Sequence, residues 1–179
     1  IIGDCEMKKP ELLAPAGSFE KAKVAFMYGA DAVYCGTASL SLRSRAEVDD
    51  NDLEKTIKYA HSIGKKVYAA LNIYAWDTNY EEIEKQGKML DEGHVDAIIA
   101  SDGGVIQKIR KIAPNIEIHV STQANVVSYH AAKFWYDNGA KRVILGRETS
   151  KDQIQEIMKN KPEDLEVEMF IHGALCWAY

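Results

Sequence analysis

Short apolar runs alternate with helical stretches along the whole chain, and this alternation limits the folds open to it. Most of the runs are apolar at consecutive positions, as in the DAIIA stretch at residues 96–100. Such runs are typical of strands that are covered on both faces, which favours a parallel sheet flanked by helices. The seven predicted strands are Glu11–Ala14, Asp31–Cys35, Lys66–Leu71, Val95–Ala100, Ile116–Val120, Arg142–Leu145 and Leu165–Ile171.

The stretches between these runs have the pattern of amphipathic helices. Apolar residues recur at helical spacing, as at Leu53, Ile57 and Ala60. Residues 78–81 (TNYE) and 150–153 (SKDQ) match the capping box that marks a helix start. The sequence therefore predicts helices that begin just after Thr78 and just after Ser150.

Glycines end several of the predicted helices. Gly29, Gly64, Gly93 and Gly139 each follow a helical stripe, where a left-handed residue is expected. Three of the joints also share a pattern in which the helix ends on glycine, turns tightly and enters a buried strand, at residues 28–34, 92–98 and 138–144.

Repeated βα units with short joints build either an open doubly wound sheet or a (β/α)8 barrel. Units of near-equal length and the lack of a nucleotide-binding fingerprint favour the barrel. Seven strands are one unit short of closing it. We therefore predict an α/β fold, TIM-barrel-like with parallel strands, in the form of an incomplete barrel of seven strands.

The length of 179 residues fits one domain. We expect residues 1–8 to be a disordered or tag-like leading segment and residues 9–179 to form the single βα-repeat domain. The chain stops just past the seventh predicted strand, so we expect it to be a fragment. An incomplete barrel leaves sheet edges and apolar faces uncovered, which predicts that this segment alone forms homo-oligomers or exchanges elements between copies.

Composition narrows the function classes. The net charge of −5 excludes a uniformly basic surface for nucleic acid but leaves room for a local basic patch. No apolar run approaches the ~20 residues that a membrane span needs, and no secretory leader pattern occurs. Cys5, Cys35 and Cys176 are too few and too widely spaced for a secreted disulfide framework. The composition predicts a cytoplasmic protein without a membrane partner.

Polar side chains follow the carboxyl ends of most predicted strands, where parallel α/β folds place their chemistry. The candidates are Arg45, Asn72, Asp102, Ser121, Gln123, Arg147, Glu148 and His172. Arg45 and Arg147 suit an anionic ligand, because a guanidinium group binds carboxylate or phosphate in a bidentate fork.

Plainer interpretations stay open for three of these residues. Asp102 precedes two glycines and is equally compatible with a simple turn. Glu148 is compatible with a surface ion pair to Arg147 or Arg142. His172 is as compatible with a packed core histidine as with a site residue.

Hydrolase motifs are absent from the sequence. It contains neither a Gly-x-Ser-x-Gly elbow nor a His-Glu-x-x-His zinc helix, and its five histidines lack metal-ligand spacing. Cys35 lies inside a predicted buried strand and is assigned to packing. Cys176 lies beyond a strand end, but a lone thiol is a poor metal site.

Five motifs, taken together and in this order, resemble the peptidase U32 family of collagenase-like proteins. They are ELLAPAG at residues 11–17, GADAVYCG at 29–36, STQ at 121–123, LGRE at 145–148 and EMFIHGALC at 168–176. The last motif is the most specific. It is similar to the first half of the family signature, so the resemblance implies that the chain is truncated within that signature.

The resemblance implies a TIM-barrel-like domain and two activities. Some family members are described as collagenase-type peptidases. Others hydroxylate a pyrimidine of tRNA or rRNA, use prephenate and carry an iron–sulfur cluster on four cysteines. By position, Cys176 would be the first ligand of a 4Fe-4S cluster that is completed outside this chain.

The rim residues favour RNA hydroxylation over proteolysis. Prephenate is a dicarboxylate that suits Arg45 and Arg147, while Asn72, Ser121 and Gln123 suit a pyrimidine. Two aromatic residues, Tyr74 and Trp76, offer a ring for stacking. The catalytic group is not identified. The candidates for it are Asp102, Gln123, Glu148 and His172.

Two alternatives remain at this point. One is a peptidase that acts on unfolded or collagen-type chains. The other is a non-catalytic assembly module, which would keep its function after Arg45→Ala and Arg147→Ala together.

Overall fold

The computed structural model describes residues 9–37 and 47–173. Its strands are β1 (Leu13–Pro15), β2 (Ala32–Thr37), β3 (Glu47–Val48), β4 (Lys66–Ala70), β5 (Ala97–Ala100), β6 (Glu117–Val120), β7 (Arg142–Ile144) and β8 (Glu166–Glu168). Its α-helices are α1 (Phe19–Met27), α2 (Asp50–Ser62), α3 (Tyr80–Glu92), α4 (Gly103–Ile112), α5 (Tyr129–Asp137) and α6 (Lys151–Asn160). Two 3-10 turns, η1 (Asp77–Asn79) and η2 (Thr122–Ala124), follow the β4 and β6 strand ends.

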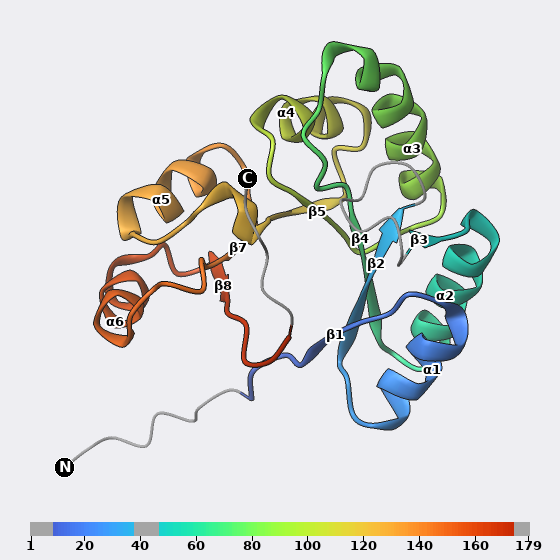
Figure 1. Ribbon diagram of the computed structural model, residues 1–179, viewed down its shortest axis with the longest axis horizontal. Coiled ribbons are helices and arrows are strands. Elements are labelled where there is room, and N and C mark those ends of the chain that lie inside the picture. Colours follow the sequence, from blue (N-terminus) through green and yellow to red (C-terminus); the bar gives the residue numbers. More distant parts are fainter. Residues whose placement is uncertain (1–8, 38–46, 174–179) are drawn as a thin grey trace.

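Seven of the strands form one parallel path in the order β1-β2-β4-β5-β6-β7-β8, which confirms the predicted alternation. The two-residue strand β3 pairs with β2 outside this path and was not predicted. Figure 1 shows the six α-helices around the outside of the curved sheet. Among the described residues no pairing joins β1 to β8, so the barrel is incomplete, as predicted.

Alternate residues of each strand supply two separate cores, and this explains the continuous apolar runs. Val33, Val67 and Ile98 pack outward against the helices. Tyr68 and Ile99 pack inward with their neighbours on the concave face. The sheet is therefore buried on both faces, as parallel sheets with helical connections require.

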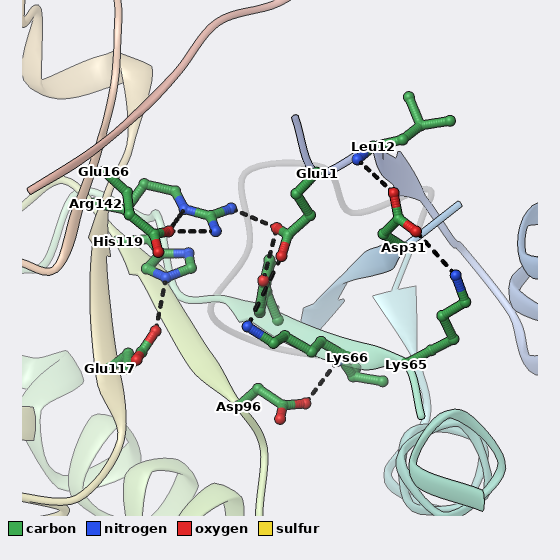
Figure 2. A network of polar contacts seen from close by, with 12 residues as sticks. Glu11, Leu12, Asp31, Lys65, Lys66, Asp96, Glu117, His119, Arg142 and Glu166 are labelled. Atoms are coloured by element: carbon green, nitrogen blue, oxygen red, sulfur yellow. Dashed lines mark hydrogen bonds and ion pairs between the residues drawn. The ribbon is translucent and has the colours of Figure 1, made fainter. Parts of the chain in front are cut away.

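Ion pairs link the two edge strands across the amino-terminal end of the sheet. Arg142, the first residue of β7, is 6% exposed. It donates to Glu166 at 2.6 and 2.8 Å, to Glu11 at 2.7 Å and to Glu168 at 3.1 Å. Glu11 lies two residues before β1 and also accepts from the Tyr68 hydroxyl at 2.8 Å. Figure 2 shows Arg142 between Glu166 and Glu11, so side-chain contacts tie β1 to β8 where backbone pairing does not.

Burial and charge act against each other in this group. Burial tends to raise the pKa of Glu11, but the hydrogen bonds from Arg142 and Tyr68 outweigh it, so the pKa lies below its usual value. The pKa of Glu168 is raised instead, because burial exceeds the attraction of Arg142. Burial tends to lower the pKa of Arg142, but its contacts with the acidic residues outweigh burial, the hydrogen bond to Glu11 most of all. The pKa of Arg142 is therefore raised above its usual value. The guanidinium therefore stays charged, and its loss would leave three partly buried carboxylates without a cation.

The structure confirms one of the two predicted helix starts. Ser150 forms the predicted capping box with Gln153 at the start of α6. The Thr78 box is wrong, because residues 77–79 form a 3-10 turn in which the Asn79 side chain accepts from the Trp76 N–H at 2.8 Å. α3 then begins at Tyr80 without a side-chain cap.

Three of the four predicted glycine joints adopt the left-handed conformation. Gly29, Gly64 and Gly139 have φ values of 98°, 68° and 87°. The prediction is wrong at Gly93, whose φ is −76°. His94 takes the left-handed position instead, with φ of 58°. No helix in the described residues is long and apolar enough to cross a membrane.

Candidate functional site

Amide and hydroxyl side chains meet at the carboxyl ends of β4 and β6. Asn72 follows β4, and its Nδ2 donates to Gln123 Oε1 at 2.9 Å. The buried hydroxyl of Ser121, directly after β6, donates to the same oxygen at 3.2 Å. Parallel pairing of both strands with β5 brings these ends together across it. The three predicted neutral binding residues thus form one hydrogen-bonded group, which we name the amide group.

The amide group contains a buried acceptor. Asn72 Oδ1 is covered, and it has no hydrogen-bond partner among the described residues. Leaving a buried polar atom unpaired costs about 1–3 kcal/mol, so such atoms are uncommon. A ligand that offers an N–H or O–H group would satisfy Asn72 Oδ1.

The 3-10 turn η2 holds Gln123 in place. The Ser121 side chain accepts from the Gln123 N–H, and Asn125 ends the turn in the left-handed conformation, with φ of 54°. Thr122 Oγ1 donates to the carbonyl of Leu145 at 3.2 Å, which fastens the turn to the end of β7. The position of the Gln123 amide is therefore fixed by two neighbouring strands.

Arg147 lies at the next strand end, after β7. Its guanidinium group stands 4.2 Å from the centroid of the Phe170 ring, and Nη1 donates to the carbonyl of Gly173 at 3.3 Å. These contacts fasten Arg147 to the segment that follows β8. They orient the planar fork that was predicted to bind an anion.

Asp102 is a helix cap. It precedes α4 and accepts from the Val105 N–H at 2.9 Å, so the turn interpretation accounts for its local structure. Burial raises the pKa of Tyr80, and the nearby charge of Asp102 and a hydrogen bond to it add to the rise. The sequence did not indicate Tyr80 as a site residue, because its spacing places it on the apolar face of a helix.

The structure contradicts the plainer interpretation of His172 and one of the two ion pairs considered for Glu148. Glu148 is exposed, and its carboxylate lies so close to Gly146 that an added Cβ would come within 2.7 Å of Oε1. A surface pair of Glu148 with Arg142 is wrong, because Arg142 is buried and bonded to other carboxylates. His172 is exposed, so the packed core histidine is also wrong.

Two predicted site residues, Arg45 and Cys176, lie outside the described residues, as do Cys5 and the leading segment 1–8. Cys35 lies in β2, where burial raises the pKa of its thiol to about 12, in agreement with a packing role. The described part of the chain contains no group of three or more His, Cys, Asp or Glu side chains able to hold a metal ion. It therefore supplies no ligand set for an iron–sulfur cluster.

A pocket of about 380 Å³ lies at the opposite, amino-terminal end of the strands. Lys66, Asp96 and Glu117 line it, together with residues of the joints that precede β5 and β6. Barrels of this kind carry their active sites at the carboxyl ends of the strands. We therefore place the functional site at the rim that carries the amide group.

Asp102, Gln123 and Arg147 all stand at that rim, because they follow the adjacent strands β5, β6 and β7. The exposed aromatic residues Tyr74 and Trp76 lie at the same end, in the segment between β4 and α3. The ion pairs of Arg142 with Glu11, Glu166 and Glu168 were not predicted from the sequence. The alternation of Glu166 and Glu168 about Val167 was a signal that one face of this strand is charged.

A family model described as peptidase family U32 matches residues 17–179. The tRNA hydroxylation protein P of Haemophilus influenzae is 47% identical over 172 residues, 96% of this chain and 37% of that protein. The 23S rRNA 5-hydroxycytidine C2501 synthase of Escherichia coli is 37% identical over 169 residues, 94% of this chain and 25% of that protein. The chain thus spans well under half the length of these relatives.

A solved structure, that of the U32 peptidase Mk0906, has the same fold. It superposes with a TM-score of 0.70 at 14% identity, covering 89% of this chain and 68% of the other. This similarity supports the barrel-like architecture, and at this identity it carries no conclusion about the reaction.

Proposed function

This chain belongs to peptidase family U32, and on that basis we propose that it is part of an enzyme that hydroxylates a pyrimidine of tRNA, or of rRNA. The observation that carries the proposal is the 47% identity, over nearly the whole chain, to a tRNA hydroxylation protein. The enzyme would work in the cytoplasm, where its RNA substrates are.

The rim supports this proposal through its two kinds of polar group. The Arg147 fork suits a carboxylate, so we assign it, with Arg45, to prephenate as a small anionic co-substrate. The neutral amide group of Asn72, Ser121 and Gln123 suits a nucleobase, which presents N–H and C=O groups at its edge. Asp102, Gln123, Glu148 and His172 remain the catalytic candidates.

The cluster and the RNA backbone require groups beyond those described. We propose Cys176 as the first ligand of a 4Fe-4S cluster, with three thiolates from outside this chain, since four are needed. We assign no chemical step to it. With a net charge of −5, the chain relies on a local patch or on other regions of the protein for phosphate contacts.

Proteolysis is the second candidate, because the similar solved structure is named a peptidase. A peptidase needs an activated nucleophile or a metal-bound water. In the described residues no serine hydroxyl is bonded to a histidine, and that of Ser121 donates to an amide. Burial raises the pKa of the Cys35 thiol to about 12, which makes it a poor nucleophile. These observations favour hydroxylation.

Mass spectrometry of RNA nucleosides from a deletion strain tests the proposed function. We expect the strain to lose a hydroxylated pyrimidine and the full-length gene to restore it. Purified full-length protein should leave gelatin intact. Unchanged hydroxypyrimidine levels together with cleavage of gelatin would contradict the proposal and support the peptidase.

A further inference from the structure

The unpartnered oxygen of Asn72 discriminates between the ligands that the rim could hold. Oδ1 is a hydrogen-bond acceptor, and it is buried without a partner among the described residues. Carboxylates at neutral pH are acceptors only, so a dicarboxylate would be repelled there. A nucleobase edge carries N–H donors. The acceptor therefore favours the base over the anion at this position.

Gln123 adds a donor beside this acceptor. Its Oε1 already accepts from both Asn72 Nδ2 and Ser121 Oγ. In the described part of the chain, this leaves the Gln123 Nε2 group available to a ligand. An acceptor next to a donor complements a pyrimidine edge, because uracil offers N–H beside C=O and cytosine offers an amino group beside a ring nitrogen.

The same loop carries an exposed aromatic ring. Trp76 is 75% exposed and lies four residues after Asn72, on the way from β4 to α3. Stacking of one base on an aromatic side chain contributes about 1–3 kcal/mol, and bases in single strands are recognised in this way. The polar and the stacking elements are thus both present at one strand end.

We propose that Asn72 and Gln123 hold the polar edge of an unpaired target pyrimidine while Trp76 stacks on its ring. This inference rests on the proposed function and assigns the base to the β4 and β6 strand ends, leaving the anion to Arg147. Because Oδ1 is covered in the free chain, the loop of residues 71–76 shifts to admit the base.

The test uses full-length protein and a synthetic RNA stem–loop that carries the pyrimidine mapped by nucleoside mass spectrometry. A second stem–loop has the same base methylated at its N–H donor. We expect wild-type protein to bind the unmethylated RNA at least tenfold more tightly, because methylation removes the donor that Asn72 Oδ1 accepts. In the Asn72→Ala variant this preference should fall below threefold.

Gln123→Glu and Trp76→Ala separate the other two contacts. Gln123→Glu keeps the oxygen that Asn72 and Ser121 bond to and replaces the open donor with a charged acceptor. We therefore expect binding to weaken while the melting temperature stays within a few degrees. Trp76→Ala should weaken both RNAs about equally. Tyr28→Ala is the matched control, since Tyr28 is 85% exposed at the other end of the strands, and it should change neither affinity.

The outcomes separate this inference from the proposed function. If wild-type protein restores the hydroxylated base but the Asn72→Ala variant still discriminates against the methylated RNA, the base-reading role is wrong and the function stands. If no hydroxylated base depends on the gene, the function itself fails.

Discussion

Replacing Arg142 with alanine is expected to lower the free energy of unfolding by about 3 kcal/mol. This is the lower end of the cost of removing one partner of a buried ion pair, because Arg142 is buried but its three carboxylates are only partly so. The guanidinium bonds three carboxylates, and two of them belong to β8. The third, Glu11, leads into β1. Without the cation these carboxylates repel one another, and the edge strands lose the contact that joins them. Urea denaturation followed by circular dichroism measures the change.

Two control variants show whether burial of the charge is the cause. Arg142→Lys keeps a cation but loses the fork, so its effect should be smaller than that of alanine. Lys133→Ala breaks an exposed ion pair with Asp137 within α5, and it should cost less than about 1 kcal/mol. Equal, small effects for Arg142→Ala and Lys133→Ala would show that the Arg142 network does not hold the edges together.

Under the function proposed above, replacing Arg147 with alanine should reduce hydroxylation by the full-length protein about 100-fold. Truncating one partner of a charge-assisted contact costs about 2–5 kcal/mol, and each 1.4 kcal/mol is a factor of ten. Arg147 follows β7 at the rim, and its contacts with Phe170 and Gly173 hold the guanidinium group in place. The loss should therefore appear mainly as a raised KM for the anionic co-substrate. Steady-state measurement of hydroxypyrimidine formation at varied prephenate gives this value.

Arg147→Lys separates charge from geometry. Lysine keeps the cation but offers no planar fork, so we expect an intermediate loss. Tyr28→Ala, at the opposite end of the strands, is the control and should leave the KM for the co-substrate unchanged. If co-substrate KM is unchanged in Arg147→Ala, the anion is bound elsewhere and the assignment of this arginine is wrong.

The fold was largely predictable because its strands are buried on both faces. Runs such as residues 97–100 have no polar residue, and several such runs alternating with helical stretches are typical of a parallel sheet covered by helices. The short strand β3 was missed, since two residues that pair at a strand end leave no periodic signal. The left-handed residue at the end of α3 was also assigned wrongly. The sequence favoured Gly93, because glycine adopts this conformation most easily, but His94 adopts it.

The rim was predictable from one rule, that polar residues after parallel strands gather at one end. That rule brought out Asn72 and Gln123, which are bonded to each other although 51 positions apart. It could not show which atom of Asn72 lacks a partner. The rule also could not predict the role of Arg142. An arginine at the start of a strand is usually exposed, and only the three-dimensional fold brings Glu11 and Glu166 beside it.

Photocrosslinking of the RNA tests most directly where the substrate binds. Full-length protein is irradiated with a stem–loop that carries 5-iodouridine at the target position, and the crosslinked peptide is identified by mass spectrometry. Our account predicts crosslinks to Tyr74 or Trp76, at the carboxyl ends of the strands. Crosslinks confined to Tyr28 or to the pocket beside His94, at the opposite end, would contradict it.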